Sequence, residues 1–455
     1  MRRAAIIGGG ITGLSAAYEL ARAGVSCALI ERRGRLGGVI RTERIEGCLV
    51  ETGPDSFLAQ KPWALELIRE LGLGGEVIGS NDHLRVTYVL RGGRLEPLPD
   101  GLLMMVPTRI WPLLRTPLLG PGAKLRMALE WFRRARPGAG GDRPVAEFVA
   151  EHFGREALDY LAEPLLAGVY GGDPERLSVA SVLPRLLELE RRYGSLTRGV
   201  LAARRRPVGE AAGPLFQTLR GGLGRLVEAL ETALKGRVEM VRGEAEALER
   251  RGTGYAIRVN GEWLEAGAAV LACPAWEAAR LLRAPAGELA ALLEAIPYTS
   301  SITVSLGYRR EDVNHRLEGF GFLVPRRERR AVTACTWVGT KFSHRVPERM
   351  ALLRCFLGEE ALLGDSDEGL AALVRQELAR IMGLGAEPRF VRVARWPRSM
   401  AQYTVGHAER LAEIEARASR LPGLHLAGNA YEGIGVPDCV RLGRRAARRV
   451  IQGSE

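Results

Sequence analysis

The first thirty residues alternate between apolar runs and small residues, and the run lengths predict a strand, a helix and a second strand. Ala4–Ile7 is a short apolar run, followed by a glycine-rich stretch over residues 8–13. Residues 14–24 carry apolar side chains at helical spacing and end at a glycine. Residues 25–31 form a second apolar run that ends in a glutamate. This order predicts a β-α-β unit.

The pattern changes in the middle of the chain and then returns. Residues 92–215 repeat apolar side chains every three and four positions, which predicts a mainly helical segment. Residues 237–274 are typical of strands joined by glycine turns, and residues 290–400 alternate strands and helices. A last helix is expected from Val440 to Ile451. We therefore expect an α/β fold in which two long excursions leave one discontinuous Rossmann-type domain.

A chain of 455 residues is too long for one ordinary core and indicates two or three domains. The alternation of patterns predicts three. They are a nucleotide-binding domain of residues 1–75, 216–288 and 402–455, a mixed α+β substrate-binding domain of residues 76–91 and 289–401, and a mainly helical domain of residues 92–215.

The composition is that of a globular protein, with 46% hydrophobic and 26% charged residues. The formal net charge is +12, and arginine supplies nearly all of the positive charge. Biased composition explains this, and so does an anionic partner such as a membrane surface or a substrate with carboxylates. Nucleic acid is not an expected partner, because the arginines are spread along the chain and no nucleic-acid-binding module is present.

The six cysteines form no CxxC pair and lie mostly in apolar runs. They are typical of small buried side chains in a reducing compartment, and no disulfide framework or metal site is expected. No signal peptide is expected before the first strand, and no apolar run is long enough to span a membrane. We expect a cytoplasmic protein.

One segment is unusually apolar without being continuous. Residues 97–120 are rich in Leu, Met and Trp but are interrupted by four prolines. Two interpretations stay open: an interfacial or substrate-facing element, or core between short helices. With Arg109 and Arg115 near lipid head groups, the first would place the helical domain on the cytoplasmic face of a membrane as a peripheral protein.

The strongest local motif joins the first strand to the first helix. Gly8, Gly10 and Gly13 have the GxGxxG spacing, and Glu31 ends the second strand where an acceptor for ribose hydroxyls is expected. Glycines there allow a tight turn, close approach to a pyrophosphate and packing of the helix on the strand. The sequence therefore predicts a dinucleotide site.

A second glycine pair, Gly37-Gly38, follows within residues 32–42, and a strand with a Gly-Pro turn follows in LVETGPDSF, residues 49–57. Nicotinamide enzymes have no need of this extension. With it the sequence resembles the flavin amine oxidase superfamily, which includes monoamine oxidases, phytoene desaturases and porphyrinogen oxidases. The resemblance implies FAD as the cofactor.

The FAD-binding residues expected from motif and resemblance together lie in four parts of the chain. In GNAYEGIGVPDC, residues 428–439, the glycines would let backbone pack against the flavin, and the last helix would point its first N–H groups at the flavin C2 carbonyl. The expected residues are Gly8, Gly10, Ile11, Thr12, Gly13, Glu31, Arg32, Gly37, Gly38, Gly53, Pro54, Asp55, Ser56, Val238, Asn429, Ile434, Gly435 and Val436.

Within the superfamily the chain resembles the oxygen-dependent porphyrinogen oxidases of haem biosynthesis over nearly its whole length. The resemblance rests on residues 8–20 with 31–42, on LLAGVYGGDPERLSVASVLP at 165–184, on EGFGFLVP at 318–325, and on 428–439. Desaturases lack the central helical segment. Amine oxidases are expected to place an aromatic cage and usually a lysine at the flavin. The chain has only four lysines, and none is expected near those motifs.

The resemblance implies removal of six electrons from a porphyrinogen in three hydride transfers to flavin N5, with O2 reduced to H2O2. No dedicated catalytic base and no metal are expected. Gly168, Phe320, Gly321, Leu323 and Phe356 would surround the macrocycle, although core packing also explains each of them. Gly321, between two aromatic residues in an expected strand, suggests close approach of a ligand.

The sequence offers two positions for the residue that anchors the substrate's propionates. The arginine that many protoporphyrinogen oxidases place there aligns with Thr87, and Arg85 would face the same side of a strand. Protoporphyrinogen and coproporphyrinogen both stay open as substrates. Other expected properties are a monomer or homodimer and hand-over of product to a ferrochelatase. The alternatives are an FAD oxidase or desaturase of another lipophilic substrate, and a non-catalytic scaffold.

Overall fold

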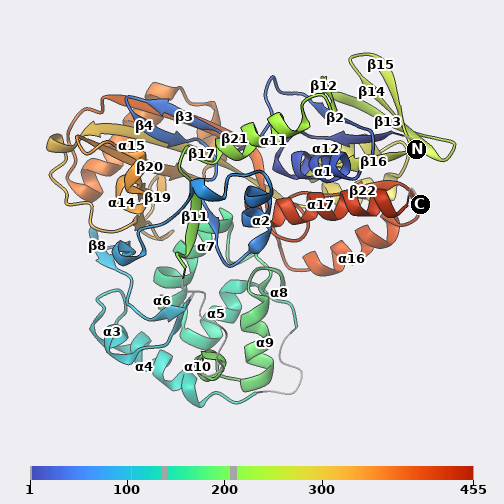
Figure 1. Cartoon of the computed structure of the whole chain (residues 1–455). Coiled ribbons are helices and arrows are strands. Elements are labelled where there is room, and N and C mark those ends of the chain that lie inside the picture. The colour runs from blue at the N-terminus through green and yellow to red at the C-terminus, as the bar shows by residue number, and fades with distance from the viewer. Residues whose placement is uncertain (1–2, 104, 136–140, 205–212, 454–455) are drawn as a thin grey trace.

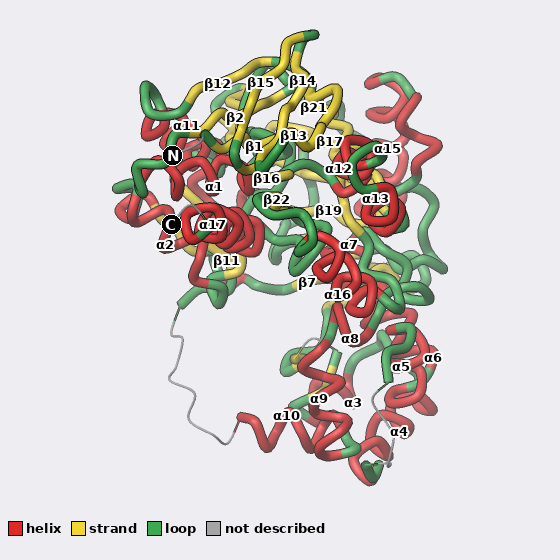
Figure 2. The backbone as a smooth tube through the Cα atoms, turned by 90° about the vertical axis from the view of Figure 1, so that its right-hand side faces the viewer, coloured by secondary structure: helices red, strands yellow, loops and turns green. Residues whose placement is uncertain are grey.

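A computed structural model describes residues 3–103, 105–135, 141–204 and 213–453. Two sheets lie side by side in the upper part of Figure 1, and a group of helices lies below them. Figure 2 shows from a second side that these helices form a lobe of their own. The chain is thus a mixed α/β structure with its two ends on the same side of the molecule.

The first sheet has five parallel strands that come from distant parts of the chain. Their order is β12 (Glu239–Arg242), β2 (Cys27–Glu31), β1 (Ala4–Ile7), β16 (Ala268–Leu271) and β22 (Leu424–Leu426). The predicted β-α-β unit at the N-terminus is confirmed, and so is the return of later segments to this sheet. Parallel strands that are buried on both faces are expected to be continuously apolar, as β1 is.

Helices cover one face of this sheet and an antiparallel sheet lies on the other. The helices are α1 (Ile11–Arg22), α11 (Gly224–Leu234) and α17 (Val436–Gln452), and their apolar side chains share one core with β1 and β2. The antiparallel sheet consists of β13 (Ala245–Arg251), β14 (Gly254–Val259) and β15 (Glu262–Ala266). The last helix begins at Val436, four residues before the predicted start, because Pro437 occupies its first turn, where proline is favourable.

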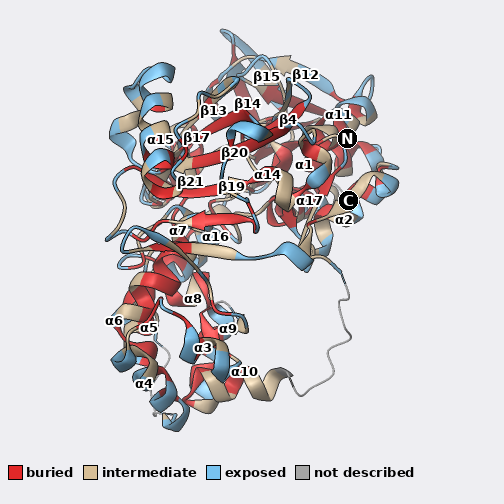
Figure 3. Cartoon of the chain, turned by 90° about the vertical axis from the view of Figure 1, so that its left-hand side faces the viewer, coloured by how far each residue is buried: buried red, intermediate tan, exposed pale blue. Residues whose placement is uncertain are grey.

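The second large sheet has seven strands in the order β21, β17, β20, β19, β18, β7 and β8. The strands are β21 (Phe390–Ala401), β17 (Tyr298–Arg309), β20 (Met350–Leu357), β19 (Val332–Trp337), β18 (Gly321–Leu323), β7 (Thr87–Arg91) and β8 (Arg94–Pro97). Helix α15 (Asp367–Met382) packs its apolar face on this sheet. Figure 3 shows that central strands of both large sheets, such as β1, β17 and β20, are mostly buried.

The chain leaves this sheet later than the sequence pattern indicated. Residues 94–97 still pair with β7, and the first helix of the lobe begins at Ile110. The lobe contains α3 (Ile110–Arg115), α4 (Pro121–Leu129), α5 (Val145–Phe153), α7 (Glu163–Tyr170), α8 (Val179–Val182), α9 (Pro184–Tyr193) and α10 (Leu196–Arg204). Met104, inside the apolar segment 97–120, is outside the described residues.

A buried hydrogen-bond network joins helices of the lobe. His152 on α5 contacts Glu130 through Nδ1 and Glu190 through Nε2, at 3.0 Å each. Glu130 also accepts hydrogen bonds from the Leu196 and Thr197 amides, which are the first free N–H groups of α10. One glutamate thus satisfies a helix N-terminus and joins it to a second helix.

Candidate active site

A large cavity of about 1310 Å³ lies between the parallel sheet, the seven-stranded sheet and α7. Its wall includes the residues that follow β1, β2 and β16, which lie at the carboxyl ends of the parallel strands. Ligands of open parallel sheets bind at this edge. The cavity then continues past α17 to β18, β19 and β20.

The predicted dinucleotide motif lines one end of this cavity. Gly8, Gly10, Ile11 and Thr12 all contribute, and Gly10 is the N-cap of α1 with no capping side chain. The first amides of α1 therefore remain available for an anion. Gly13 does not line the cavity. A Cβ there would lie 1.9 Å from the Gly8 carbonyl oxygen, so Gly13 serves the packing of helix on strand.

Both carboxylate oxygens of Glu31 accept backbone hydrogen bonds, and one of these bonds holds the glycine loop. Its Oε2 accepts from the Gly9 amide and its Oε1 from the Arg33 amide, each at 2.7 Å. An ionised carboxylate has about four lone-pair positions, so both oxygens can also accept from ribose hydroxyls. Glu31 and Arg32 both line the cavity, as predicted.

The second glycine pair packs directly against the first loop. The Gly37 amide donates to the Gly9 carbonyl oxygen at 2.8 Å, and Gly37 and Gly38 have φ of 93° and 61°. A Cβ on Gly38 would lie 3.1 Å from the Gly10 Cα. The two loops therefore need glycine both for their left-handed conformations and for their close contact.

Val238 is not where the sequence placed it. It lies before β12, in the core shared with α1 and α11, and does not line the cavity. Gly243 and Ala245, which follow β12, line the cavity instead, and the Gly243 amide donates to the Glu31 carbonyl oxygen at 3.0 Å. Ligands bind at the carboxyl ends of parallel strands, so these two residues could have been identified once β12 was known to end at Arg242.

The segment of residues 428–439 lines the cavity further along. Asn429, Ile434, Gly435 and Val436 all contribute to its wall. Gly435 is the N-cap of α17 and supplies no capping side chain, so this helix too opens its first amides toward the cavity. The Tyr403 hydroxyl donates to the Asn429 carbonyl oxygen and accepts from the Gly433 amide, both at 2.8 Å, which holds the segment in place.

Gly53, Pro54, Asp55 and Ser56 line the same region, where Asp55 meets a lysine. Lys341 Nζ lies 2.8 and 3.1 Å from the Asp55 carboxylate oxygens, and Lys341 itself lines the cavity. The expectation that no lysine lies near the motifs is therefore wrong. Lys341 is 286 residues from Asp55, and only the fold brings them together.

Three cations surround the Asp55 carboxylate. Burial would raise the pKa of Asp55, but Lys341, Arg354 and Arg345 outweigh burial and hold that pKa below its usual value. Burial lowers the pKa of Lys341, against the opposing effect of Asp55. Arg354, on β20, also lines the cavity, and its Nε is buried without a hydrogen-bond partner among the described residues. This part of the wall is electropositive.

The predicted substrate residues divide into two groups. Gly168 on α7, Leu323 on β18 and Phe356 on β20 line the cavity. Phe320 and Gly321 do not. The backbone of Phe320 pairs with Val86 and Trp337, and a Cβ on Gly321 would lie 1.9 Å from the Cys335 carbonyl oxygen. The close approach inferred at Gly321 is thus that of the neighbouring strand β19, and no ligand is needed to explain it.

Arg85 and Thr87 also lie outside the cavity wall. Arg85 ends a short 3₁₀ turn, so it is not on a strand, and its side chain is 46% exposed and 3.6 Å from Asp82. Thr87 is the first residue of β7 and pairs with Gly321. Arg326 and Arg329, in the turn after β18, line the cavity, and the sequence analysis did not select them.

The residues present fit FAD. The cavity joins an open helix N-terminus at α1, suited to a pyrophosphate, to a second one at α17, suited to a carbonyl oxygen that gains negative charge on reduction. A Cβ at Gly10 would contact only the Gly38 Cα, at 4.0 Å, so the space beside the backbone is open.

Comparison with known proteins agrees with this site. The family described as flavin containing amine oxidoreductase matches residues 11–451. A coproporphyrinogen III oxidase of Bacillus subtilis is 36% identical over 459 residues, covering 97% of this chain and 96% of the relative. The human protoporphyrinogen oxidase is 32% identical, covering 99% and 98%.

Solved structures show the same fold. A structure from Exiguobacterium sp. 255-15 has a TM-score of 0.88 at 33% identity, covering 99% of this chain and 98% of that one. A putrescine oxidase variant covers 99% of both chains with a TM-score of 0.72 at 20% identity, which supports the fold alone. The chain belongs to the flavin-containing amine oxidoreductase family and is an FAD-dependent oxidoreductase.

Proposed function

We propose that this enzyme oxidises a porphyrinogen to a porphyrin in haem biosynthesis and that coproporphyrinogen is among its substrates. The observation that carries the proposal is the shape and lining of the cavity. From the FAD-binding end it continues into a space whose wall includes Gly168, Leu323 and Phe356, together with Arg326. An apolar space with cations at its edge suits a tetrapyrrole that carries carboxylates. The relatives named above support the same substrate class.

The balanced reaction is porphyrinogen plus three O2 giving porphyrin plus three H2O2. When bound, FAD accepts two electrons at a time and transfers them to O2, so the oxidation needs three cycles. The residues of this chain hold and orient the macrocycle. Leu323 and Phe356 offer apolar contact. Gly168 leaves room for the macrocycle, because a side chain there would take up space beside Leu323: its Cβ alone would lie 3.4 Å from Leu323 Cδ2. We assign no residue as a catalytic base.

Oxidation of an amine is the second candidate, because Lys341 in the cavity wall is a feature expected of amine oxidases. Lys341 is already paired with Asp55 in this structure, at 2.8 and 3.1 Å, so its presence in the wall does not by itself favour an amine substrate. The relatives of 30% identity or more support a porphyrinogen instead.

The test uses purified protein loaded with FAD and supplied in air with coproporphyrinogen III, protoporphyrinogen IX or a set of amines. We expect porphyrin fluorescence to rise, with three H2O2 for each porphyrin, and no H2O2 from amines. Loaded enzyme that produces H2O2 from amines and leaves both porphyrinogens at their spontaneous oxidation rate would overturn the proposal.

We also propose that the helical lobe, which begins with α3 at Ile110, docks on the surface of an anionic membrane. Among the described residues, no helix combines the length and apolarity needed to cross a bilayer. Helices α3 and α4 and the turn after α4 nevertheless expose large apolar side chains, with Ile110, Trp111 and Phe132 at 73%, 70% and 74%. Arg109 and Arg115 flank the first two in sequence. Apolar side chains with flanking arginines are typical of interfacial elements.

Flotation with vesicles tests this docking. We expect the holoenzyme to float with anionic vesicles, less so at high salt, and a Trp111→Ser and Phe132→Ser double variant to stay at the bottom. Trp263→Ser is the control, because Trp263 is an exposed tryptophan on β15, outside the lobe. Equal flotation of all three proteins, or no flotation of the wild type at low salt, would refute the docking surface.

A further inference from the structure

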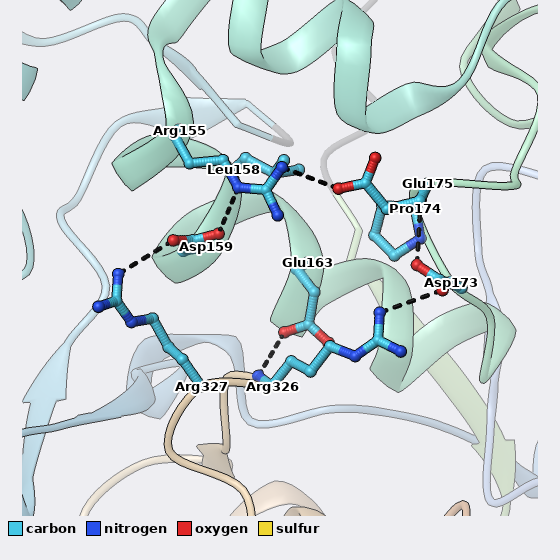
Figure 4. A pocket seen from close by; sticks show the side chains of 9 residues that line it. All are labelled: Arg155, Leu158, Asp159, Glu163, Asp173, Pro174, Glu175, Arg326 and Arg327. Atoms are coloured by element: carbon cyan, nitrogen blue, oxygen red, sulfur yellow. Dashed lines mark hydrogen bonds and ion pairs between the residues drawn. The ribbon is translucent and has the colours of Figure 1, made fainter.

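A small hollow beside the main cavity is lined almost entirely by charged side chains. Arg155, Asp159, Glu163, Asp173, Glu175, Arg326 and Arg327 lie around it, together with Leu158 and Pro174 (Figure 4). Glu163, Asp173, Pro174 and Arg326 also line the main cavity. The hollow therefore adjoins the place where the substrate would lie.

Two neighbouring arginines in the turn after β18 make similar ion pairs. Arg326 Nη1 lies 3.1 Å from Asp173 Oδ2, and Arg327 Nη1 lies 3.1 Å from Asp159 Oδ2. Their side chains are 65% and 59% exposed. Figure 4 shows them diverging from adjacent positions to their separate acids. Only Arg326 borders the main cavity.

The turn that carries Arg326 is firmly held. Glu163 on α7 accepts from the Arg326 amide at 3.0 Å and from Arg329 Nη2 at 2.8 Å. The same Arg329 Nη2 donates to the Val324 carbonyl oxygen at 2.9 Å. The Arg329 guanidinium is thus occupied by hydrogen bonds within the protein. The Arg326 side chain extends from a backbone that is held in place.

The ion pair of Arg326 is easily exchanged. Exposed pairs of this kind contribute little to stability, so Arg326 leaves its acid with little loss. Asp173 keeps a partner when it does, because Asp173 Oδ1 also accepts from the Glu175 amide at 3.1 Å. A substrate carboxylate that takes the place of Asp173 gives Arg326 a partner of the same charge and chemistry.

We propose that Arg326 binds a propionate carboxylate of the porphyrinogen, and that Asp173 holds Arg326 in place until the substrate arrives. The inference rests on the proposed function and assigns the anchor that Arg85 does not provide. Arg326 lies three residues beyond Leu323, and Asp173 lies five residues beyond Gly168. Both residues of this ion pair therefore lie only a few positions along the chain from a residue in the wall of the substrate space.

The variants Arg326→Ala, Arg326→Lys and Asp173→Asn test the exchange, with Arg327→Ala and Asp159→Asn as matched controls. Each is loaded with FAD, and the flavin absorbance and melting temperature are recorded first. We expect Arg326→Ala to raise KM for coproporphyrinogen about tenfold to a hundredfold with kcat little changed, because a contact remote from the reacting carbon binds ground and transition states alike. Arg326→Lys should retain part of the effect, because a lysine keeps the charge without the planar fork.

Removing the competing acid should have the opposite effect. Asp173→Asn is expected to lower KM about twofold to fivefold, since only an exposed pair is lost. A second readout is the affinity for coproporphyrin, the product, measured by quenching of protein fluorescence. It should weaken in Arg326→Ala and not in Arg327→Ala.

Two failures are distinguishable. Active wild-type enzyme whose Arg326→Ala and Arg327→Ala variants have equal KM and equal product affinity would overturn the role of Arg326 alone. Wild-type enzyme that neither oxidises a porphyrinogen nor binds coproporphyrin would overturn the proposed function, and this inference with it.

Discussion

Replacing Glu31 by alanine should separate binding of FAD from folding. The carboxylate accepts hydrogen bonds from the Gly9 and Arg33 amides and still faces the cavity. The variant therefore removes the acceptor for the ribose hydroxyls and, with it, the group that shapes the glycine loop.

The two effects differ in size. A hydrogen bond to a charged group contributes about 1.5–3 kcal/mol, so two bonds to ribose hydroxyls contribute about 3–6 kcal/mol. This corresponds to FAD binding that is about a hundredfold to ten-thousandfold weaker. In the FAD-free protein, the partly buried Gly9 amide loses its hydrogen-bond acceptor, which should lower the free energy of unfolding by about 1–3 kcal/mol. For 455 residues, the entropy of unfolding is about 1 kcal/mol per kelvin, so the melting temperature should fall by about 1–3 °C.

The assay is retention of FAD after dialysis, followed by titration of the FAD-free protein with FAD. Glu239→Ala is the matched control, because Glu239 starts the neighbouring strand β12 and makes an exposed ion pair with Arg3. We expect Glu239→Ala to keep its FAD and Glu31→Ala to lose it while melting cooperatively. Unchanged affinity in Glu31→Ala would show that the ribose is bound elsewhere, and our reasoning from the loop geometry would be wrong.

Three further predictions concern other parts of the structure. Asp55→Asn should leave Lys341 without its carboxylate, while Arg345 keeps Glu51, and should cost about 3–5 kcal/mol. This loss should lower the melting temperature by about 3–5 °C. Asp100→Asn, which breaks an exposed pair, should change nothing measurable. Burial, aided by a nearby arginine, lowers the pKa of His425 to about 4. The free energy of unfolding should therefore fall as pH falls from about 6.5 toward 4. In a His425→Gln variant this free energy should depend less on pH. Gly168→Leu should fold, because the residue is helical, and should lower kcat/KM for porphyrinogens by filling the cavity, whereas unchanged kinetics would place the macrocycle elsewhere.

The residues that the sequence predicted well are those whose role is set by local backbone. Gly8, Gly10, Gly37 and Gly38 occur in short motifs where glycine is required, and all four line the cavity. The loop before α17 belongs to the same class. Such positions can be found from a few adjacent letters.

The residues that were missed are brought to the site by pairing of distant segments. Lys341 and Arg326 carry no motif of their own, and each reaches the cavity because of how its strand or turn is placed. Val238 precedes β12 and lies in the core, outside the cavity wall, and Arg85 is not on a strand, because a 3₁₀ turn precedes β7. Gly321 shows that a glycine in a strand indicates close approach without saying whether the neighbour is a ligand or another strand.

The order of the strands in the parallel sheet has a consequence for synthesis of the protein. The edge strand β22 and the helix α17 follow all other strands of this sheet in the chain, and they complete a sheet and a cavity that begin with β1. A growing chain therefore carries the glycine loop and Glu31 long before it has Asn429 and Gly435. Stable capture of FAD is expected only after α17 has been synthesised, and a chain that stops before β22 is expected to leave the ribosome without cofactor.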